Sequence, residues 1–344
     1  MKLLTIMMPC YNVEAYLNKG LSTLASKKFE DALEVLIIDD GSTDRTAEIA
    51  SKYVQEYPKI FRLVQKENGG HGSAINEGIR QAKGKYFRIL DGDDWVLTEQ
   101  LGELLERLLK IHADLVVDKR CEVHMVTGEK NHIPLPVHEL EGQTLLQNVA
   151  YPFEHLCSME AVSRYFMIHN FSVKTELLRA HKVTVLEGVF YEDSEYVLKA
   201  TSICKTITFV DLEIYQYMIG NVNQSVSTEN FVKRFEHFHK VTCEMLAYEK
   251  ENKRKISSQQ VQQYMTRRCR TVVLTEYYIA LIYDTDRKRG RQRGKMLYRL
   301  LQKEYPDMAK MTAMRYRLDC MMHFLGVNYH ALQLMRHALI GGKR

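Results

Sequence analysis

Three carboxylates, those of Asp91, Asp93 and Asp94, directly follow the apolar run 86–90. Carboxylates this close together at the end of a strand repel one another unless a hard divalent cation and a phosphate-bearing ligand neutralise them. The cluster therefore predicts a site for Mn2+ or Mg2+ that also holds a diphosphate. The alternative interpretation is an acidic surface turn that binds no metal. For an acidic cluster considered by itself, this alternative would be favoured.

The elements that would position this cluster alternate along the first hundred residues. Short continuous apolar runs, typical of strands in a parallel sheet covered on both faces, are separated by segments with helical spacing. This order predicts an α/β fold with a doubly wound, mostly parallel sheet and right-handed crossovers. Ligands of such sheets bind at the carboxyl ends of the strands. The expected strands are 3–8, 33–38, 61–64 and 86–90, and the expected helices are about 14–27, 43–56 and 73–82.

The turn after the first strand contains neither GxGxxG nor GxxxxGK[ST], which excludes a dinucleotide fingerprint and a P-loop at that position. Asp40, at the end of the second expected strand, is our candidate for accepting a hydrogen bond from a uracil ring N–H. Tyr11 would supply a stacking face, and Asn12 an amide for the base or ribose. The alternative for the Asp40 region is helix capping, a role that Ser42 or Asp44 would fill.

Four motifs, 8–12, 38–44, 67–79 and 90–95, stand in the order and spacing of one known family. Together they resemble glycosyltransferase family 2, whose members have the GT-A fold. The resemblance implies a nucleotide-sugar donor, usually UDP-linked, and a divalent metal held by the aspartates of a DxD motif. It also implies transfer with inversion at the anomeric carbon.

The same resemblance assigns roles to individual residues. Asp40 corresponds to the uracil-reading carboxylate, and Asp91 and Asp93 to the DxD pair, with Asp93 or Asp94 as the direct metal ligand. His71 departs from the Ala- and Arg-rich stretch of many relatives, so it either replaces their arginine contact to the donor or is only a loop residue. The residues expected to bind the donor are Pro9, Tyr11, Asn12, Glu14, Asp40, Asn68, Gly69, His71, Asn76, Asp91 and Gly92.

In the second half, Glu192 and Asp193 resemble the family's Glu-Asp motif, in which the aspartate is the catalytic base. A sugar hydroxyl is a poor nucleophile near neutral pH, so a carboxylate within hydrogen-bond reach must take its proton. The competing interpretation is that these acids cap the helix expected at 194–200. Residues 215–227 resemble a loop that closes over the diphosphate, with Asn221, Gln224 and Ser225 as further hydrogen-bond donors.

Composition sets outer limits on these assignments. The chain has 344 residues with 45% hydrophobic content, enough for a substantial core. Its seven cysteines are scattered without a CxxC pair, which argues against a disulfide framework or a structural zinc site and fits a reducing cytosol. His237 and His239 lack the spacing of a helical metal pair, so no zinc is assigned there. No apolar run approaches membrane-spanning length, and we expect a cytoplasmic protein.

Charge is unevenly distributed along the chain. Residues 231–344 carry 24 Lys or Arg against 10 Asp or Glu, a net charge of +14, whereas residues 1–230 sum to −9. We therefore predict a catalytic domain at 1–228, with a nucleotide-sugar-binding half (1–125) and an acceptor half (126–228), and a basic helical extension at 229–344. The basic extension favours peripheral contact with an anionic membrane, or else is an ordinary solvated face. Within it, residues 287–295 are expected to form a basic turn between helices.

The sequence thus predicts an inverting glycosyltransferase. It would transfer a hexose or N-acetylhexosamine from a UDP-sugar to a hydroxyl of a glycan or lipid-linked glycan in cell-surface polysaccharide synthesis. Two alternatives remain: a sugar nucleotidyltransferase, which normally has a Gly-rich basic loop after its first strand, and a non-catalytic scaffold that binds nucleotide sugars. No nucleic-acid motif is present, and a homo-oligomer is left open.

Overall fold

The computed structural model describes residues 2–136, 148–220 and 227–329. The chain divides into two compact units, which are described separately. The first comprises Met1–Asn223 with Ile256–Tyr264, and the second comprises Gln224–Lys255 with Met265–Arg344. The predicted boundary near residue 228 stays a prediction, since the short segment Ile256–Tyr264 belongs to the first unit.

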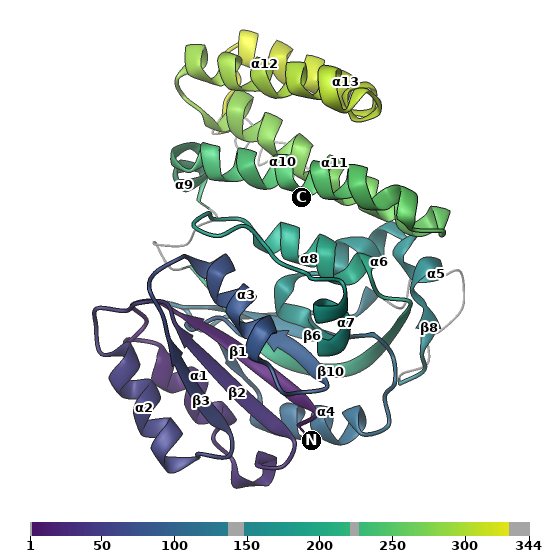
Figure 1. Ribbon diagram of the computed structural model, residues 1–344. Coiled ribbons are helices and arrows are strands. Elements are labelled where there is room, and N and C mark those ends of the chain that lie inside the picture. The colour runs from purple at the N-terminus through teal and green to yellow at the C-terminus, as the bar shows by residue number, and fades with distance from the viewer. Residues whose placement is uncertain (1, 137–147, 221–226, 330–344) are drawn as a thin grey trace, which may run out of the picture. The chain divides into compact units, whose positions relative to one another are not determined.

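The first unit is built on one mixed sheet with strand order β3-β2-β1-β4-β9-β6-β10-β5, to which β7 and β8 add at the sides (Figure 1). The first four strands pair in parallel, as the alternating pattern predicts, and β6 also pairs in parallel with β10. Strands β5, β7, β8 and β9 pair antiparallel with their neighbours. The predicted α/β class is therefore confirmed. The strands are β1 (Leu4–Cys10), β2 (Leu33–Asp39), β3 (Phe61–Gln65), β4 (Tyr86–Ile89), β5 (Trp95–Val96), β6 (Leu115–His124), β7 (Lys130–Ile133), β8 (Tyr151–Pro152), β9 (Phe171–Lys174) and β10 (Thr206–Ile219).

Helices of the first unit cover this sheet, and β1 and β2 are buried along their whole length. The three expected helices exist, with ends that differ by up to three residues. The first begins late because residues 12–14 bind the loop after β2 instead of starting a helix. The helices are α1 (Leu17–Leu24), α2 (Thr46–Glu56), α3 (His71–Gln81), α4 (Thr98–Leu108), α5 (Phe153–Cys157), α6 (Glu160–Tyr165), α7 (Thr175–Ala180) and α8 (Asp193–Ser202).

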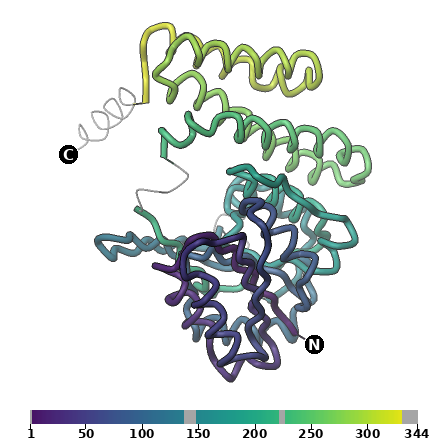
Figure 2. Tube along the Cα trace, turned by 60° about the vertical axis from the view of Figure 1, so that its left-hand side comes forward, coloured from purple at the N-terminus to yellow at the C-terminus, as the bar shows by residue number. Residues whose placement is uncertain are grey.

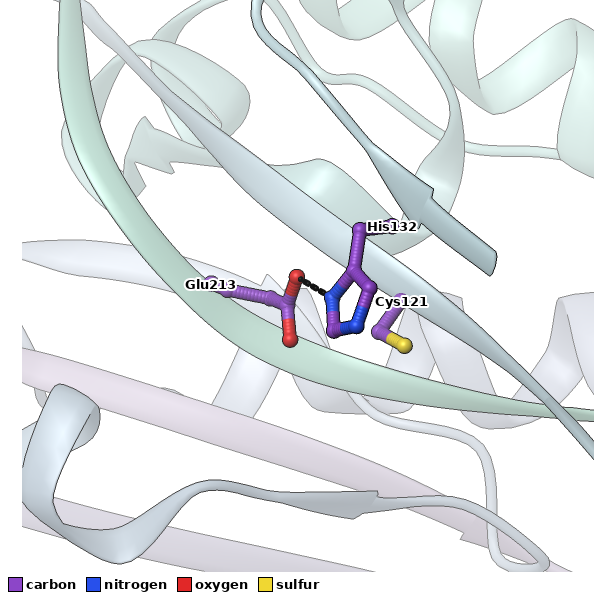
Figure 3. Close-up of side chains that lie close together, drawn as sticks. All are labelled: Cys121, His132 and Glu213. Atoms are coloured by element: carbon purple, nitrogen blue, oxygen red, sulfur yellow. Dashed lines mark hydrogen bonds and ion pairs between the residues drawn. The ribbon is translucent and has the colours of Figure 1, made fainter. Parts of the chain in front are cut away.

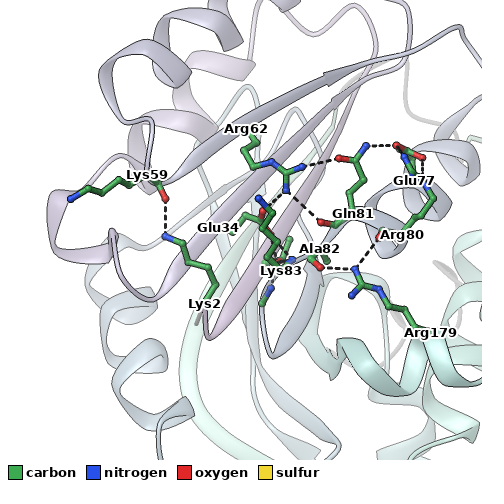
Figure 4. A network of polar contacts seen from close by, with 12 residues as sticks. Lys2, Glu34, Lys59, Arg62, Glu77, Arg80, Gln81, Ala82, Lys83 and Arg179 are labelled. Atoms are coloured by element: carbon green, nitrogen blue, oxygen red, sulfur yellow. Dashed lines mark hydrogen bonds and ion pairs between the residues drawn. The ribbon is translucent and has the colours of Figure 1, made fainter.

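A network of charged groups joins the amino ends of the strands, at the edge opposite the predicted site (Figure 4). Glu34 lies at its centre: its carboxylate accepts hydrogen bonds from Arg62 at 2.6 Å, from the Thr5 hydroxyl at 2.6 Å and from the Lys83 amide at 2.7 Å. Arg62 also donates to the side chain of Gln81 at 2.8 Å. The network thereby connects β1, β2 and β3 with the end of α3.

A second buried ion pair lies in the middle of the sheet. Arg88 of β4 is fully buried and donates to Asp118 of β6 and, at 2.7 Å, to the carbonyl oxygen of His169. A buried guanidinium needs such partners because an uncompensated charge in the interior is strongly destabilising. This pair therefore fixes the short helical turn Ile168–Asn170 beside the end of β4.

The second unit is helical, as the sequence predicts. Its last two helices run side by side (Figures 1 and 2). None of the helices in the described part of the chain is both long and apolar enough to cross a lipid bilayer. The helices are α9 (Thr228–Lys233), α10 (Phe235–Asn252), α11 (Gln259–Tyr278, which begins in the first unit), α12 (Arg287–Glu304) and α13 (Pro306–Phe324), with a π-helical segment at Ile279–Tyr283.

The prediction of a basic turn at 287–295 is wrong, because these residues form the first half of α12. The side chain of Asp286 caps this helix by accepting from the amides of Lys288 and Arg289. Gly290 and Gly294 lie one helical turn apart on a packed face, and a Cβ at Gly290 would stand only 2.2 Å from the carbonyl oxygen of Ala280. These glycines therefore serve close helix packing and not a turn.

Candidate active site

The loops after β1 and β2 are held together at the carboxyl edge of the sheet. Asn12, with φ of 52°, accepts a hydrogen bond from the Thr43 amide at 2.8 Å, and its own amide donates to Ser42 at 3.0 Å. Left-handed backbone is uncommon for residues other than glycine, although asparagine tolerates it best. Beside Asn12 the ring of Tyr11 is 51% exposed, so a flat aromatic face is available to a ligand.

Asp40 is buried, and its carboxylate organises the loop that leads into α3. It accepts from the Lys66 ammonium at 2.7 Å, the Gly70 amide at 2.7 Å and the Gly69 amide at 3.0 Å. Gly70 has φ of 85°, a conformation that glycine adopts without strain. The structure thus shows Asp40 at the expected edge with a loop-holding role, and uracil recognition by Asp40 stays a prediction.

The acidic cluster lies where β4 ends, and its three carboxylates have different surroundings. Asp91 is flanked by two imidazoles, with His71 Nε2 at 3.1 Å and His169 Nε2 at 3.4 Å. Asp94 is buried and accepts from the Tyr215 hydroxyl at 2.6 Å and the Met218 amide at 2.7 Å. Strand β10 therefore holds Asp94 in place.

His71 links this cluster to the second acidic motif. Its Nδ1 lies 2.6 Å from a carboxylate oxygen of Glu192, on the side of the ring opposite Asp91. The contact depends on Gly72, where an added Cβ would lie 2.1 Å from the carbonyl oxygen of Leu186. Glycine is therefore required for α3 to approach the segment that carries Glu192.

Asn76 and Gly69 strengthen the same junction between α3 and residues 185–193. The Asn76 side chain exchanges two hydrogen bonds, both 2.9 Å, with the backbone of Val185, and Gly188 donates to the carbonyl oxygen of Gly69 at 2.6 Å. Asn76 also donates to Glu187 at 2.9 Å. The structure gives Asn76 a bracing position, and donor binding by Asn76 stays a prediction.

Asp193 is the first residue of α8 and follows a strained segment. Tyr191 has φ of 75°, an outlier for a bulky residue, and such strain persists only where the surroundings enforce it. Glu192 is buried against His71, whereas Asp193 keeps access to solvent although the surrounding protein partly desolvates its carboxylate. Of the two acids, Asp193 is thus the one that a substrate can reach.

The charges of this site shift one another's pKa values. Desolvation by the surrounding protein and the charge of Asp91 raise the pKa of Asp93 to about 6. Desolvation and the charge of Glu192 likewise raise the pKa of Asp193 to about 6. Desolvation acts in the same direction on Asp91, but the hydrogen bonds with His169 and His71 outweigh it and hold the pKa of Asp91 well below its usual range.

The residues present fit a hard divalent cation. Ligand atoms of Asp91, Asp94 and His169 lie within 4.8 Å of one another, and Asp93 adds a carboxylate close by. Carboxylate oxygens with one imidazole suit Mn2+, and carboxylates alone suit Mg2+. The raised pKa values of Asp93 and Asp94 reflect uncompensated negative charge that a cation would neutralise. The donor set of the site therefore agrees with the predicted metal.

Sequence reasoning missed two contributors, His169 and Tyr215. His169 contacts Asp91, and its buried Nδ1 has no hydrogen-bond partner among the described residues. Tyr215 was expected in a loop, but 215–219 lies in β10 and residues 221–226, including Asn221, Gln224 and Ser225, fall outside the described residues. No local pattern marks either residue, because the sheet topology brings them to the site.

The remaining predicted donor residues all lie near the carboxyl ends of the strands. Asn68 is exposed, and Glu14 pairs with Arg45 at 3.1 Å. Pro9 and Gly92 are buried next to each other, and a Cβ at Gly92 would lie 3.0 Å from the Pro9 carbonyl oxygen. Their roles in donor binding stay predictions.

Comparison with known proteins gives a consistent result. The sequence profile described as glycosyl transferase family 2 matches residues 5–166. The glycosyltransferase GlyG of Streptococcus pneumoniae is 31% identical over 225 residues, which cover 63% of this chain and 70% of GlyG. An uncharacterized glycosyltransferase of Bacillus subtilis, EpsJ, is 27% identical over 62% of this chain and 60% of its own length, so the chain spans less than two thirds of that relative.

A solved structure shares the fold. The structure of Staphylococcus aureus TarS, residues 1–349, in complex with UDP-GlcNAc superposes with a TM-score of 0.62 at 20% sequence identity, over 96% of this chain and 93% of TarS 1–349. This similarity confirms the predicted GT-A fold with a helical C-terminal region.

Proposed function

We propose, from the premise that this chain belongs to glycosyl transferase family 2, that it transfers a hexose or N-acetylhexosamine from a UDP-sugar to a hydroxyl of a glycan or lipid-linked glycan. The supporting observation is the continuous series of contacts from Asp91 through His71 to Glu192. It joins two acidic motifs a hundred residues apart into one site. The relatives named above as glycosyltransferases, and the complex of TarS with UDP-GlcNAc, are consistent with this donor class.

In this proposal, the carboxyl ends of β1, β2 and β4 bind the donor. Tyr11 stacks on the base, and Asp40 accepts from its ring N–H. Asp91, Asp93 and Asp94 would hold Mn2+ or Mg2+, with His169 as a further ligand. When bound, the cation would offset the charge that develops on the departing diphosphate oxygen.

The acceptor side uses Asp193. Its carboxylate takes the proton of the acceptor hydroxyl while that oxygen forms its bond to the anomeric carbon, and the sugar configuration inverts. Glu192 stays buried and positions His71, whose hydrogen bonds to Asp91 and Glu192 raise its pKa well above the usual value although burial opposes this. The protonated imidazole would keep the two acidic motifs from repelling each other.

The test measures UDP release from a panel of UDP-sugars with Mn2+ and with EDTA. We expect one or a few donors to be hydrolysed slowly with Mn2+ and none with EDTA. Asp93→Asn should abolish metal-dependent donor binding, whereas the matched change Asp31→Asn at an exposed position should leave it intact. Absence of hydrolysis and transfer with every donor would favour the scaffold alternative.

We further propose that the second unit binds an anionic membrane surface, where a lipid-linked acceptor would be found. One face of α13 exposes apolar side chains, among them Met314 at 84% and Phe324 at 77%, together with Lys310 and Arg317. An exposed apolar stripe flanked by basic residues is typical of helices that lie in a membrane interface. The apolar residues of this face are Met311, Met314, Leu318, Met321, Phe324 and Leu325.

Helix α12 adds charge of the same sign. Its exposed face carries five basic residues at helical spacing, and each Lys or Arg close to an anionic surface contributes about 1 kcal/mol to binding. Because α12 and α13 both expose basic residues, association of two copies through these faces would bring like charges together, whereas anionic lipids would neutralise them. The five residues are Lys288, Arg291, Lys295, Arg299 and Lys303.

Vesicle flotation tests whether the second unit binds an anionic membrane. Wild-type protein should float with vesicles containing phosphatidylglycerol and not with pure phosphatidylcholine. The double change Met314→Glu with Met321→Glu should prevent flotation, whereas Val126→Glu, at an equally exposed apolar position in the first unit, should not. Flotation that survives removal of residues 306–344 would contradict the proposal.

A further inference from the structure

A second group of metal-ligand side chains lies on three adjacent strands of the sheet, outside the acidic site. Cys121 of β6 stands opposite His132 of β7 in antiparallel pairing, and opposite Gln216 of β10 in parallel pairing. Glu213 of β10 completes the group. Figure 3 shows the imidazole of His132 between the carboxylate of Glu213 and the thiol of Cys121.

The geometry of this group is close to that of a bound metal. One ligand atom from each of Cys121, His132 and Glu213 lies within 4.8 Å of the others, and His132 Nδ1 is 2.6 Å from a Glu213 oxygen. Bonds of about 2.0–2.3 Å in a tetrahedral zinc site place ligand atoms roughly 3.3–3.8 Å apart, so only small side-chain rotations are needed. Cys121 is buried beneath the ring, while the His132 side chain is 64% exposed, which leaves a path for an ion from solvent.

The chemistry of the donors points to a particular class of ion. A thiolate and an imidazole together select zinc-like cations, whereas the oxygen-rich site at Asp91 selects Mg2+ or Mn2+. Within the described residues, the Cys121 sulfur lies 3.7 Å from the carbonyl oxygen of Glu122 and also accepts from the backbone amide of Asn131. Both are weak contacts, because sulfur is a poor hydrogen-bonding partner. Burial raises the pKa of this thiol, which would release its proton when a metal binds.

We propose that Cys121, His132 and Glu213 bind one zinc-class divalent cation, with water as the fourth ligand. Such an ion joins β7, the outer strand of the β6–β7 hairpin, to β10 across β6. Strand β10 also carries the Tyr215 hydroxyl and the Met218 backbone amide, which donate hydrogen bonds to Asp94. Occupancy of the second metal site would thereby stiffen the strand that supports the first.

The test uses the full chain, stripped of metal and supplied with excess Mg2+ to occupy the oxygen-rich site. Titration with Zn2+ by calorimetry should show one site. We expect each of three changes, Cys121→Ser, His132→Ala and Glu213→Gln, to weaken Zn2+ binding by at least about a hundredfold. Removal of a residue that only supports a metal ligand costs up to about a hundredfold in affinity, so removal of a ligand itself should cost at least as much. The controls Cys320→Ser, His181→Ala and Asp93→Asn should bind Zn2+ like the wild type.

Two further measurements make the result decisive. Co2+ in place of Zn2+ should give a thiolate-to-cobalt charge-transfer band that Cys121→Ser removes, and Zn2+ should slow hydrogen exchange of the backbone amides at 130–133. His132→Ala changes an exposed side chain, so its fold should survive even if Cys121→Ser unfolds. A cobalt band that persists in Cys121→Ser, for example from Cys243 beside His239, or Zn2+ binding unchanged in His132→Ala, would overturn the proposal.

Discussion

The two opposite edges of the parallel part of the sheet carry polar clusters of opposite character. At the amino ends, Glu34 is surrounded by an arginine, a hydroxyl and a backbone amide, so its charge and hydrogen-bonding capacity are satisfied within the protein. At the carboxyl ends, Asp91 pairs with two imidazoles and Asp94 accepts from two uncharged donors, and the pKa values of Asp93 and Asp94 still rise. The first cluster is complete without a ligand, and the second has an excess of negative charge that a ligand must balance.

The largest expected difference between the two edges comes from Asp193→Asn. With Asp193 as the proposed general base, this change should lower kcat by roughly 10²–10⁴-fold, while donor affinity stays near that of the wild type, because the amide cannot take the proton of the acceptor. Steady-state transfer assays combined with UDP-sugar calorimetry separate the two effects. Near-normal turnover in this variant would assign the base elsewhere.

Gly72→Ala should have the next largest effect. The added methyl group would collide with the Leu186 carbonyl oxygen and move α3 away from Glu192, and a misplacement of about 1 Å can reduce a rate roughly 10²-fold. The readout is kcat/KM, with Gly102→Ala as a matched control, because there the nearest atom, in Phe29, lies at an ordinary 3.4 Å. Equal rates in the two variants would show that the His71–Glu192 contact is not needed.

The pH profile should show a smaller, graded effect. Because the pKa of Asp193 is raised to about 6 and the base works only when deprotonated, kcat/KM should fall as the pH drops below about 6, approaching tenfold per pH unit. The charge of Glu192 contributes to this raised pKa, so in Glu192→Gln the acid limb should move to lower pH. A limb that moves to higher pH, or not at all, contradicts this assignment.

Glu34→Gln should leave catalysis almost unchanged and affect stability instead. Removal of one partner of a largely buried ion pair leaves Arg62 undercompensated, and we expect the free energy of unfolding to fall by about 1–3 kcal/mol. Denaturant unfolding measures this, and kcat/KM is compared well below the melting temperature. Glu48→Gln, which breaks an exposed ion pair with Lys52, should leave the free energy of unfolding almost unchanged because solvent screens exposed pairs. If kcat/KM of Glu34→Gln fell by more than the fraction of unfolded protein explains, the amino-end network would also be needed for catalysis, and the proposed difference between the two edges would be wrong.

The sequence predicted what local patterns encode. The apolar runs of β1 to β4, the intervening helices and the acidic residues at the strand ends all follow from neighbours in the chain. His169 and Tyr215 could not be found this way, since antiparallel β9 and the long β10 bring them to the site from distant segments. The same applies to Cys121, His132 and Glu213: the absence of a CxxC pair argued against a structural zinc site, yet three strands bring these side chains together.

The junction between α3 and residues 185–193 also determines where this chain can be recombined with its relatives. Gly69 and Gly188 meet backbone to backbone, Gly72 leaves no room for a side chain, and Asn76 pairs with Val185. A chimaera with another family member should therefore take α3 and residues 185–193 from the same parent. A crossover point after α8 keeps both sides of this junction from one parent, whereas a point between β4 and α8 takes the two sides from different parents.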